Sequence, residues 1–176
     1  MRKRSILLLS LAFVWLVGSV QHAASPAEAK PGTTKPGEVG SQLPELSVKD
    51  LQGREISSNE LRGKVVLIDF WATWCQPCKK EMPGYQALLG KYGSLGFTVI
   101  GFKFDTMMDT EDPLTFAKKI GVRYPLAVAS DELKSKFGGI EGLPTTMLYD
   151  REGILRQKII GFEYTNVIES KLKPLL

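Results

Sequence analysis

The sequence is poor in the side chains that bind metal ions. It holds one histidine and two cysteines in 176 residues, and the histidine, His22, lies in the N-terminal segment. A zinc site needs about four nitrogen, sulfur or oxygen ligands, which one cysteine pair without histidines cannot supply. The sequence therefore predicts neither a metal site nor a cofactor.

A marked excess of charge of one sign is also lacking. The chain has 23 basic and 19 acidic residues, and without its first 29 residues it has 20 and 18, because Arg2, Lys3, Arg4 and Glu28 are removed. Nucleic-acid-binding domains carry a concentrated basic surface, so no nucleic-acid partner is expected. The length suits one ordinary domain with an appendage.

The apolar run from Ile6 to Val17 is short for a membrane span. Basic residues at positions 2–4 precede it, and small residues follow it up to Ala29. This order is typical of a secretory signal peptide. We therefore interpret residues 1–29 as a signal peptide or an N-terminal membrane anchor, and we expect an extracytoplasmic protein. Residues 30–41 are rich in glycine and proline and predict a flexible linker, a possible membrane tether, ahead of a domain at 42–176.

Hydrophobic patterning across the domain predicts alternating strands and helices. Residues 65–70 form a nearly continuous apolar run, as expected for a strand covered on both faces of its sheet. The full expectation is a hairpin at 46–57, a helical turn at 58–61, strands at 65–70, 97–104 and 126–129, helices at 78–93, 112–120 and 131–137, a hairpin at 145–160 and a C-terminal helix. This order indicates an α/β domain with a mixed central sheet flanked by helices.

The two cysteines, Cys75 and Cys78, stand three positions apart where the helix is predicted to begin. Such a pair can alternate between dithiol and disulfide, and the positive end of the helix dipole favours a thiolate at the first cysteine. A purely structural disulfide is a weak alternative, because closing so short a loop removes little unfolded-chain entropy. The spacing therefore predicts redox chemistry.

Two separate motifs resemble one family. Residues 66–83, which include Trp71-Ala72-Thr73-Trp74-Cys75-Gln76-Pro77-Cys78, are similar to the active-site segment of thioredoxins. More narrowly they resemble exported reductases of the TlpA and ResA type, within the AhpC/TSA and redoxin superfamily. Gly142-Leu143-Pro144-Thr145-Thr146 resembles the loop that carries a cis-proline in these proteins. The resemblance implies a thioredoxin-like fold with an N-terminal β-hairpin and a βα-type insertion at 106–130.

Cys75 is the expected nucleophile, exposed at the helix N-terminus, and Cys78 the more buried resolving thiol. Gln76 and Pro77, between them, are expected to tune the reduction potential and to contact substrate. Trp74 could frame an apolar docking surface. If Pro144 is cis, as the resemblance implies, the backbone of Leu143 could pair with an extended substrate segment; an ordinary trans turn is the alternative.

Two acidic residues accompany the cysteines. Asp69 interrupts the apolar strand, so it either turns to solvent at a strand end or is a buried proton acceptor for Cys78 with a raised pKa. Its spacing matches the buried aspartate of thioredoxins. Glu81, one turn after Cys78, matches the glutamate of ResA-like reductases, although on composition it is a solvated helix residue. Which of the two accepts the proton stays open.

These observations favour a thiol-disulfide oxidoreductase that reduces protein disulfides. The resemblance implies a membrane thiol-electron donor as partner, and cytochrome c maturation as one role of such relatives. A peroxiredoxin is the first alternative, but it would use a lone reactive cysteine in a peroxide-activating loop. A copper-delivery protein is the second, and it would require more ligands near the thiols.

Overall fold

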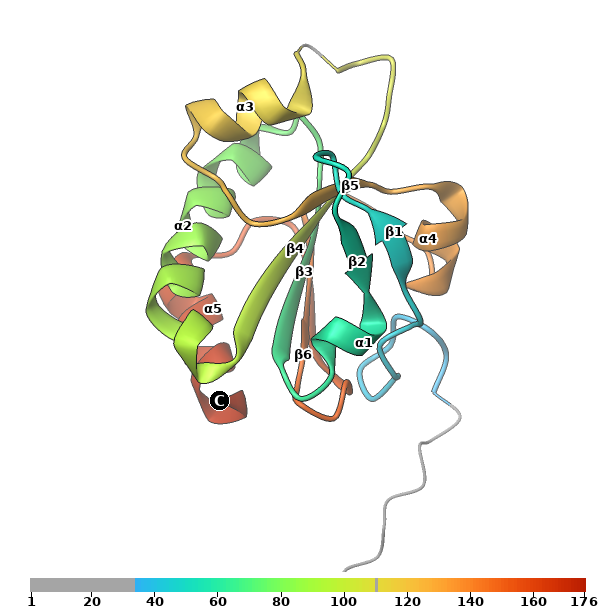
Figure 1. Ribbon diagram of the computed structural model, residues 1–176, viewed down its shortest axis with the longest axis vertical. Coiled ribbons are helices and arrows are strands. Elements are labelled where there is room, and N and C mark those ends of the chain that lie inside the picture. The colour runs from blue at the N-terminus through green and yellow to red at the C-terminus, as the bar shows by residue number, and fades with distance from the viewer. Residues whose placement is uncertain (1–33, 110) are drawn as a thin grey trace, which may run out of the picture. The chain divides into compact units, whose positions relative to one another are not determined.

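The structure, a computed structural model, describes residues 34–109 and 111–176 (Figure 1). The predicted signal peptide or anchor lies outside these residues. Within them, no helix is both long enough and apolar enough to cross a membrane.

A five-stranded sheet forms the centre of the domain, in the order β5-β4-β3-β6-β7. β3 runs parallel to β4, and β4 to β5, whereas β6 is antiparallel to both β3 and β7. All seven residues of β3 are buried, as expected for a central strand covered on both faces. The strands are β3 (Val65–Trp71), β4 (Phe97–Lys103), β5 (Leu126–Val128), β6 (Thr145–Tyr149) and β7 (Leu155–Ile160).

Helices cover both faces of this sheet (Figure 1). One face packs against α2 (Gln76–Tyr92), α3 (Pro113–Lys119) and α5 (Thr165–Leu172). The other packs against the hairpin of β1 (Ser47–Lys49) and β2 (Glu55–Ser57), against α1 (Ser58–Leu61) and against α4 (Asp131–Lys136). Two 3₁₀ turns, η1 (Gly93–Leu95) and η2 (Lys173–Leu175), follow α2 and α5.

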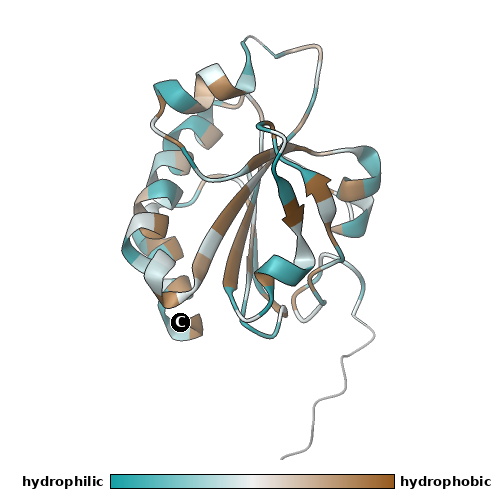
Figure 2. Ribbon diagram, in the orientation of Figure 1, coloured by the Kyte–Doolittle hydropathy of each residue, from teal (hydrophilic) through white to brown (hydrophobic). Residues whose placement is uncertain are grey.

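The α/β thioredoxin-like architecture predicted from the sequence is thereby confirmed, including the N-terminal hairpin and the insertion that supplies α3 and β5. Alternate residues of β3 enter the two cores: Leu67 and Trp71 pack towards α2, whereas Ile68 and Phe70 pack towards α4. The central strands β3 and β4 are correspondingly among the most hydrophobic segments of the domain (Figure 2).

Residues 34–41 differ from the flexible linker that their composition predicts. The Gly40 N–H donates to the Leu155 carbonyl at 2.8 Å, and the Leu155 N–H donates to the Ser41 carbonyl at 2.9 Å. A Cβ atom on Gly37 would lie 2.0 Å from the carbonyl oxygen of Phe137. Gly37 therefore permits a close backbone approach to the domain rather than free movement.

Candidate redox site

A tight turn joins β3 to α2 and presents the first cysteine. The Cys75 N–H donates to the Ala72 carbonyl at 3.1 Å, and α2 begins at the next residue, Gln76. Cys75 is the N-cap, and its Sγ accepts a hydrogen bond from the Cys78 N–H at 3.3 Å. Cys75 and Cys78 form a disulfide with an S–S distance of 2.00 Å. The pair therefore lies where unpaired N–H groups and the helix dipole stabilise a thiolate.

Burial of Cys75 corrects one expectation. Its exposed fraction is 3%, against 0% for Cys78, so in this disulfide form the first cysteine is not an exposed side chain. Both cysteines belong to the apolar cluster beneath α2, against which Trp74 and Leu143 pack as partly buried neighbours. Gln76 is exposed and Pro77 half-buried, so these two residues form the open rim of the disulfide.

The proline loop lies at the same edge of the sheet. Thr145, the first residue of β6, pairs with Phe70 near the end of β3, which places the loop before β6 beside the turn that carries Cys75. The Leu143–Pro144 peptide bond is cis, which confirms the prediction. The Pro144 carbonyl accepts from the Gly161 N–H at 2.8 Å. Pro144 is buried and Leu143 partly exposed.

Asp69 is fully buried in the middle of the sheet. Its exposed fraction is 0%, which excludes the alternative of a carboxylate turned to solvent. Its neighbours in register are Gly101 on β4 and Thr146 on β6. Neither carboxylate oxygen has a hydrogen-bond partner among the described residues. Burial disfavours the charged form and raises the pKa of Asp69 from 3.8 to about 8.

Glu81 is buried as well, with an exposed fraction of 1%, so the solvated alternative is wrong. It lies three residues after Cys78 on the buried side of α2. Burial first, and then the negative charge of Asp69, raise the pKa of Glu81 from 4.5 to about 9, against smaller opposing contributions from Tyr85 and the backbone of Glu163. The two carboxyl groups therefore influence each other's ionisation, and Glu81 lies one helical turn from Cys78.

Further polar atoms without partners surround this pair. The Trp71 indole N–H and the Tyr124 hydroxyl are buried and make no hydrogen bond to any residue that the structure describes. Both side chains lie over Gly101, where a Cβ atom would be 3.0 Å from Trp71 Nε1 and 3.2 Å from Tyr124 Cε2. By contrast, the Tyr85 hydroxyl is 2.8 Å from Thr146 Oγ1. Asp69 therefore lies among several buried polar side chains within an otherwise apolar core.

Asp69→Asn will stabilise the disulfide form at neutral pH. Between pH 4 and 8 the folded state holds the Asp69 proton that the unfolded chain has lost, so wild-type stability falls as the pH rises through this window. The amide does not titrate, so the gain in free energy of unfolding should grow by about 4 kcal/mol between pH 4 and pH 7. Urea unfolding at pH 4.5, 6 and 7.5 measures it.

Glu60→Gln, which changes an exposed acid on α1, is the matched control and should follow the wild type at each pH. An equal difference between Asp69→Asn and wild type at pH 4.5 and 7.5 would show that the folded state does not retain the Asp69 proton.

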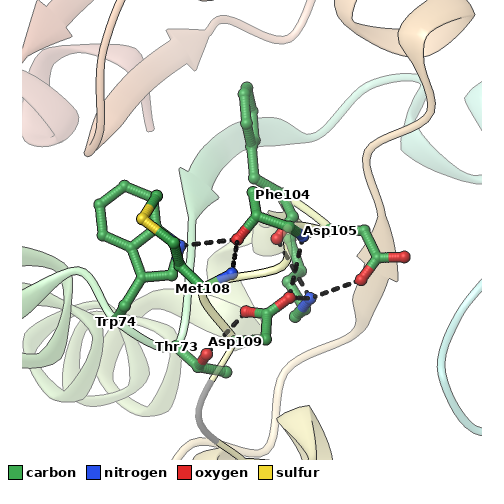
Figure 3. A network of polar contacts seen from close by, with 8 residues as sticks. Thr73, Trp74, Phe104, Asp105, Met108 and Asp109 are labelled. Atoms are coloured by element: carbon green, nitrogen blue, oxygen red, sulfur yellow. Dashed lines mark hydrogen bonds and ion pairs between the residues drawn. The ribbon is translucent and has the colours of Figure 1, made fainter.

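A second polar cluster was not predicted from the sequence. Lys103, at the end of β4, is buried and contacts the segment that follows the strand, which in turn contacts Thr73 and Trp74 beside the disulfide (Figure 3). The one sequence feature that could have indicated this cluster was a lysine between Phe102 and Phe104 in a buried strand.

No group of three or more metal-ligating side chains occurs in the part of the chain that the structure describes.

Comparisons with known proteins agree with this geometry. A model of the AhpC/TSA family matches residues 39–158. The thiol-disulfide oxidoreductase ResA of Bacillus anthracis is 33% identical over 139 residues, covering 78% of this chain and 79% of that protein. The thioredoxin-like protein YneN of Bacillus subtilis is 30% identical over 134 residues, covering 76% and 78%.

Solved structures give the same result. A thiol:disulfide interchange protein of the thioredoxin family from Chlorobium tepidum TLS is similar at 28% identity with a TM-score of 0.70, covering 82% of this chain and 99% of that chain. The thiol:disulfide interchange protein DsbE from Chlorobium tepidum is similar at 26% identity with a TM-score of 0.69, covering 78% and 97%. With a family model matched over most of the domain and ResA-type relatives aligned along most of their length, this chain belongs to the AhpC/TSA family.

Proposed function

We propose that the protein is a thiol-disulfide oxidoreductase that reduces disulfides in other proteins and needs no cofactor. The observation that carries this proposal is the Cys75–Cys78 disulfide at the N-terminus of α2. The names of the ResA and DsbE relatives support it. A zinc site would require ligands beyond two thiols.

The reaction transfers two electrons to the substrate. The Cys75 thiolate attacks one sulfur of a substrate disulfide, so that bond breaks, a mixed disulfide forms and the first substrate thiolate leaves. Cys78 then loses its proton and attacks Cys75 Sγ. The mixed disulfide breaks, the second substrate thiolate leaves, and the Cys75–Cys78 disulfide forms. The substrate gains two electrons and two protons, and the enzyme dithiol is oxidised.

Asp69 is the proton acceptor for Cys78 in this proposal. Its pKa of about 8 lies close to that of an ordinary thiol, which is the match that efficient general-base catalysis requires. The charge of Asp69 raises the pKa of Glu81, so ionisation of one carboxyl group opposes ionisation of the other. In this proposal Asp69 is the group that ionises and Glu81 stays protonated. Near neutral pH the pair therefore carries at most one negative charge.

Substrate would bind across the edge that carries Pro144 and the disulfide. The partly exposed Leu143 could offer its backbone to an extended substrate segment, and Gln76 and Pro77 border the disulfide. Trp74 and Met108 lie beside each other, with both Trp74 Nε1 and the Met108 N–H donating to Thr106 Oγ1 (Figure 3). Met108 is 59% exposed, so this side of the site offers an apolar surface to a protein.

We further propose an extracytoplasmic location, on the basis of the basic, apolar and small-residue order within residues 1–29. Each turnover leaves the enzyme oxidised, so a reductase outside the cytoplasm needs electrons from the cytoplasmic side. A membrane protein with a reactive dithiol would supply them.

The test is reduction of the interchain disulfides of insulin by the purified protein with dithiothreitol as electron source. We expect catalysis well above the rate with dithiothreitol alone. Consumption of hydrogen peroxide with no effect on insulin would instead identify a thiol peroxidase. Stoichiometric Cu(I) binding by the reduced protein, with neither activity, would identify a metal carrier.

A further inference from the structure

Both central residues of the turn before Cys75, Thr73 and Trp74, hydrogen-bond to residues outside the turn. Thr73 Oγ1 donates to Asp109 Oδ1 at 2.7 Å. Trp74 Nε1 donates to Thr106 Oγ1 at 2.9 Å. Both acceptors lie in the segment that follows β4, far along the chain from the turn (Figure 3). Thr73 is fully buried, so its hydrogen bond to Asp109 is shielded from water.

Asp109 joins three parts of the site. Its Oδ1 accepts from Thr73, while its Oδ2 accepts from Lys103 Nζ at 2.5 Å and from the Thr106 N–H at 3.0 Å. Lys103 belongs to β4 and pairs in register with Trp71, the last residue of β3. Asp109 therefore connects the turn before Cys75 to the rigid sheet.

The ammonium group of Lys103 has an acceptor for each of its three hydrogens. Lys103 Nζ donates to Asp109, to the Phe104 carbonyl at 3.1 Å and to Asp105 Oδ1 at 3.1 Å, which accounts for the three hydrogens of an ammonium group. The Lys103 side chain is 4% exposed and that of Asp109 17%. A buried charge pair of this kind is costly to break, because the remaining charge stays desolvated.

Asp109 stays ionised across the working pH range. Burial alone would raise its pKa, but the hydrogen bonds from Lys103, the Thr106 N–H and Thr73 together lower it to about 2. The hydrogen bond between Thr73 and the Asp109 carboxylate therefore does not change with pH in this range.

We propose that Asp109 is a positioning residue for the redox reaction, and that it acts through Thr73 to hold Cys75 within reach of Cys78. The proposal rests on the dithiol function above. Closing the disulfide depends on the effective concentration of one thiol at the other, which falls when the turn before Cys75 can move. Loss of the Thr73–Asp109 contact should therefore disfavour the disulfide relative to the dithiol.

The experiment measures the equilibrium constant of the Cys75–Cys78 pair with reduced and oxidised glutathione. Thr73→Val keeps the side-chain shape and removes the donor, and Asp109→Asn removes the charged acceptor. We expect each to lower the constant for disulfide formation about tenfold, which makes the potential about 30 mV less negative. Thr73→Ser keeps a hydroxyl and should restore the wild-type constant.

Glu111→Gln is the matched control, because Glu111 is an acid close in sequence to Asp109 that pairs with Lys119. Its constant should equal that of the wild type. An unchanged constant in Thr73→Val and Asp109→Asn, even with a lower melting temperature, would overturn the proposal, as would an equal fall in Thr73→Ser. Failure of the wild-type protein to reduce insulin would instead count against the proposed function. That assay is separate from the glutathione equilibrium, so the two failures can be distinguished.

Discussion

Cys75→Ser will abolish the reduction of protein disulfides, whereas Cys78→Ser will still attack a substrate once and then stop. Cys75 supplies the attacking thiolate at the N-terminus of α2, and a serine hydroxyl cannot replace it in disulfide exchange. In Cys78→Ser the mixed disulfide forms, but no second thiol is present to resolve it. We expect a covalent complex of one enzyme and one substrate chain, visible by mass spectrometry and on non-reducing gels.

Neither cysteine substitution should prevent folding, because closing so short a loop contributes little stability. Circular dichroism of both variants checks this. A covalent complex formed by Cys75→Ser through Cys78 would reverse the assigned roles. Reduction of insulin by Cys78→Ser at the wild-type rate would remove the resolving step from the mechanism.

Asp69→Asn will slow the resolving step by about 100-fold at pH 8, the usual contribution of a well-placed general base. In the wild type this step accelerates as the pH rises towards 8 and then levels off, because the carboxylate must lose its own proton before it can accept that of Cys78. In the variant the slower step should keep rising above pH 8 without levelling off, because Cys78 then loses its proton to solvent. Stopped-flow measurement of decay of a preformed mixed disulfide, at several pH values, separates this step from the initial attack.

Glu81→Gln distinguishes the two carboxyl groups. If Asp69 ionises first, Glu81 is neutral during the reaction, and the neutral amide should change the resolving rate only a few-fold. A larger loss in Glu81→Gln than in Asp69→Asn would instead make Glu81 the proton acceptor. In the double variant the resolving rate should still rise with pH, because Cys78 must lose its proton to solvent, but it should no longer level off near pH 8.

The sequence predicted the order of strands and helices because each element carries its own signal. The apolar run at β3, the Asp112-Pro113 start of α3 and the glycines after α2 and α4 are all local features. The redox pair could be predicted for the same reason, since both cysteines lie within one turn. The cis-proline depended on resemblance to a family, and the structure confirms it.

Features that depend on distant packing could not be predicted. Cys75 is buried in a cluster against which Leu143, 68 positions away in the chain, also packs, so its burial has no local signal. In the sequence Gly37 looks like a glycine of a flexible linker, and only the structure shows that its backbone lies against Phe137. Lys103 is a charge in a buried strand, but its partner, Asp109, becomes identifiable only when the segment after β4 is seen to fold back over the strand end.

The measurement that tests the central claim most directly is the reduction potential of the Cys75–Cys78 pair, determined against glutathione or dithiothreitol buffers. A reductase should hold its electrons weakly, so we predict a value near that of thioredoxin, about −270 mV, or lower. A value near that of a strong oxidant such as DsbA, about −120 mV, would contradict the account and make this protein a donor of disulfides.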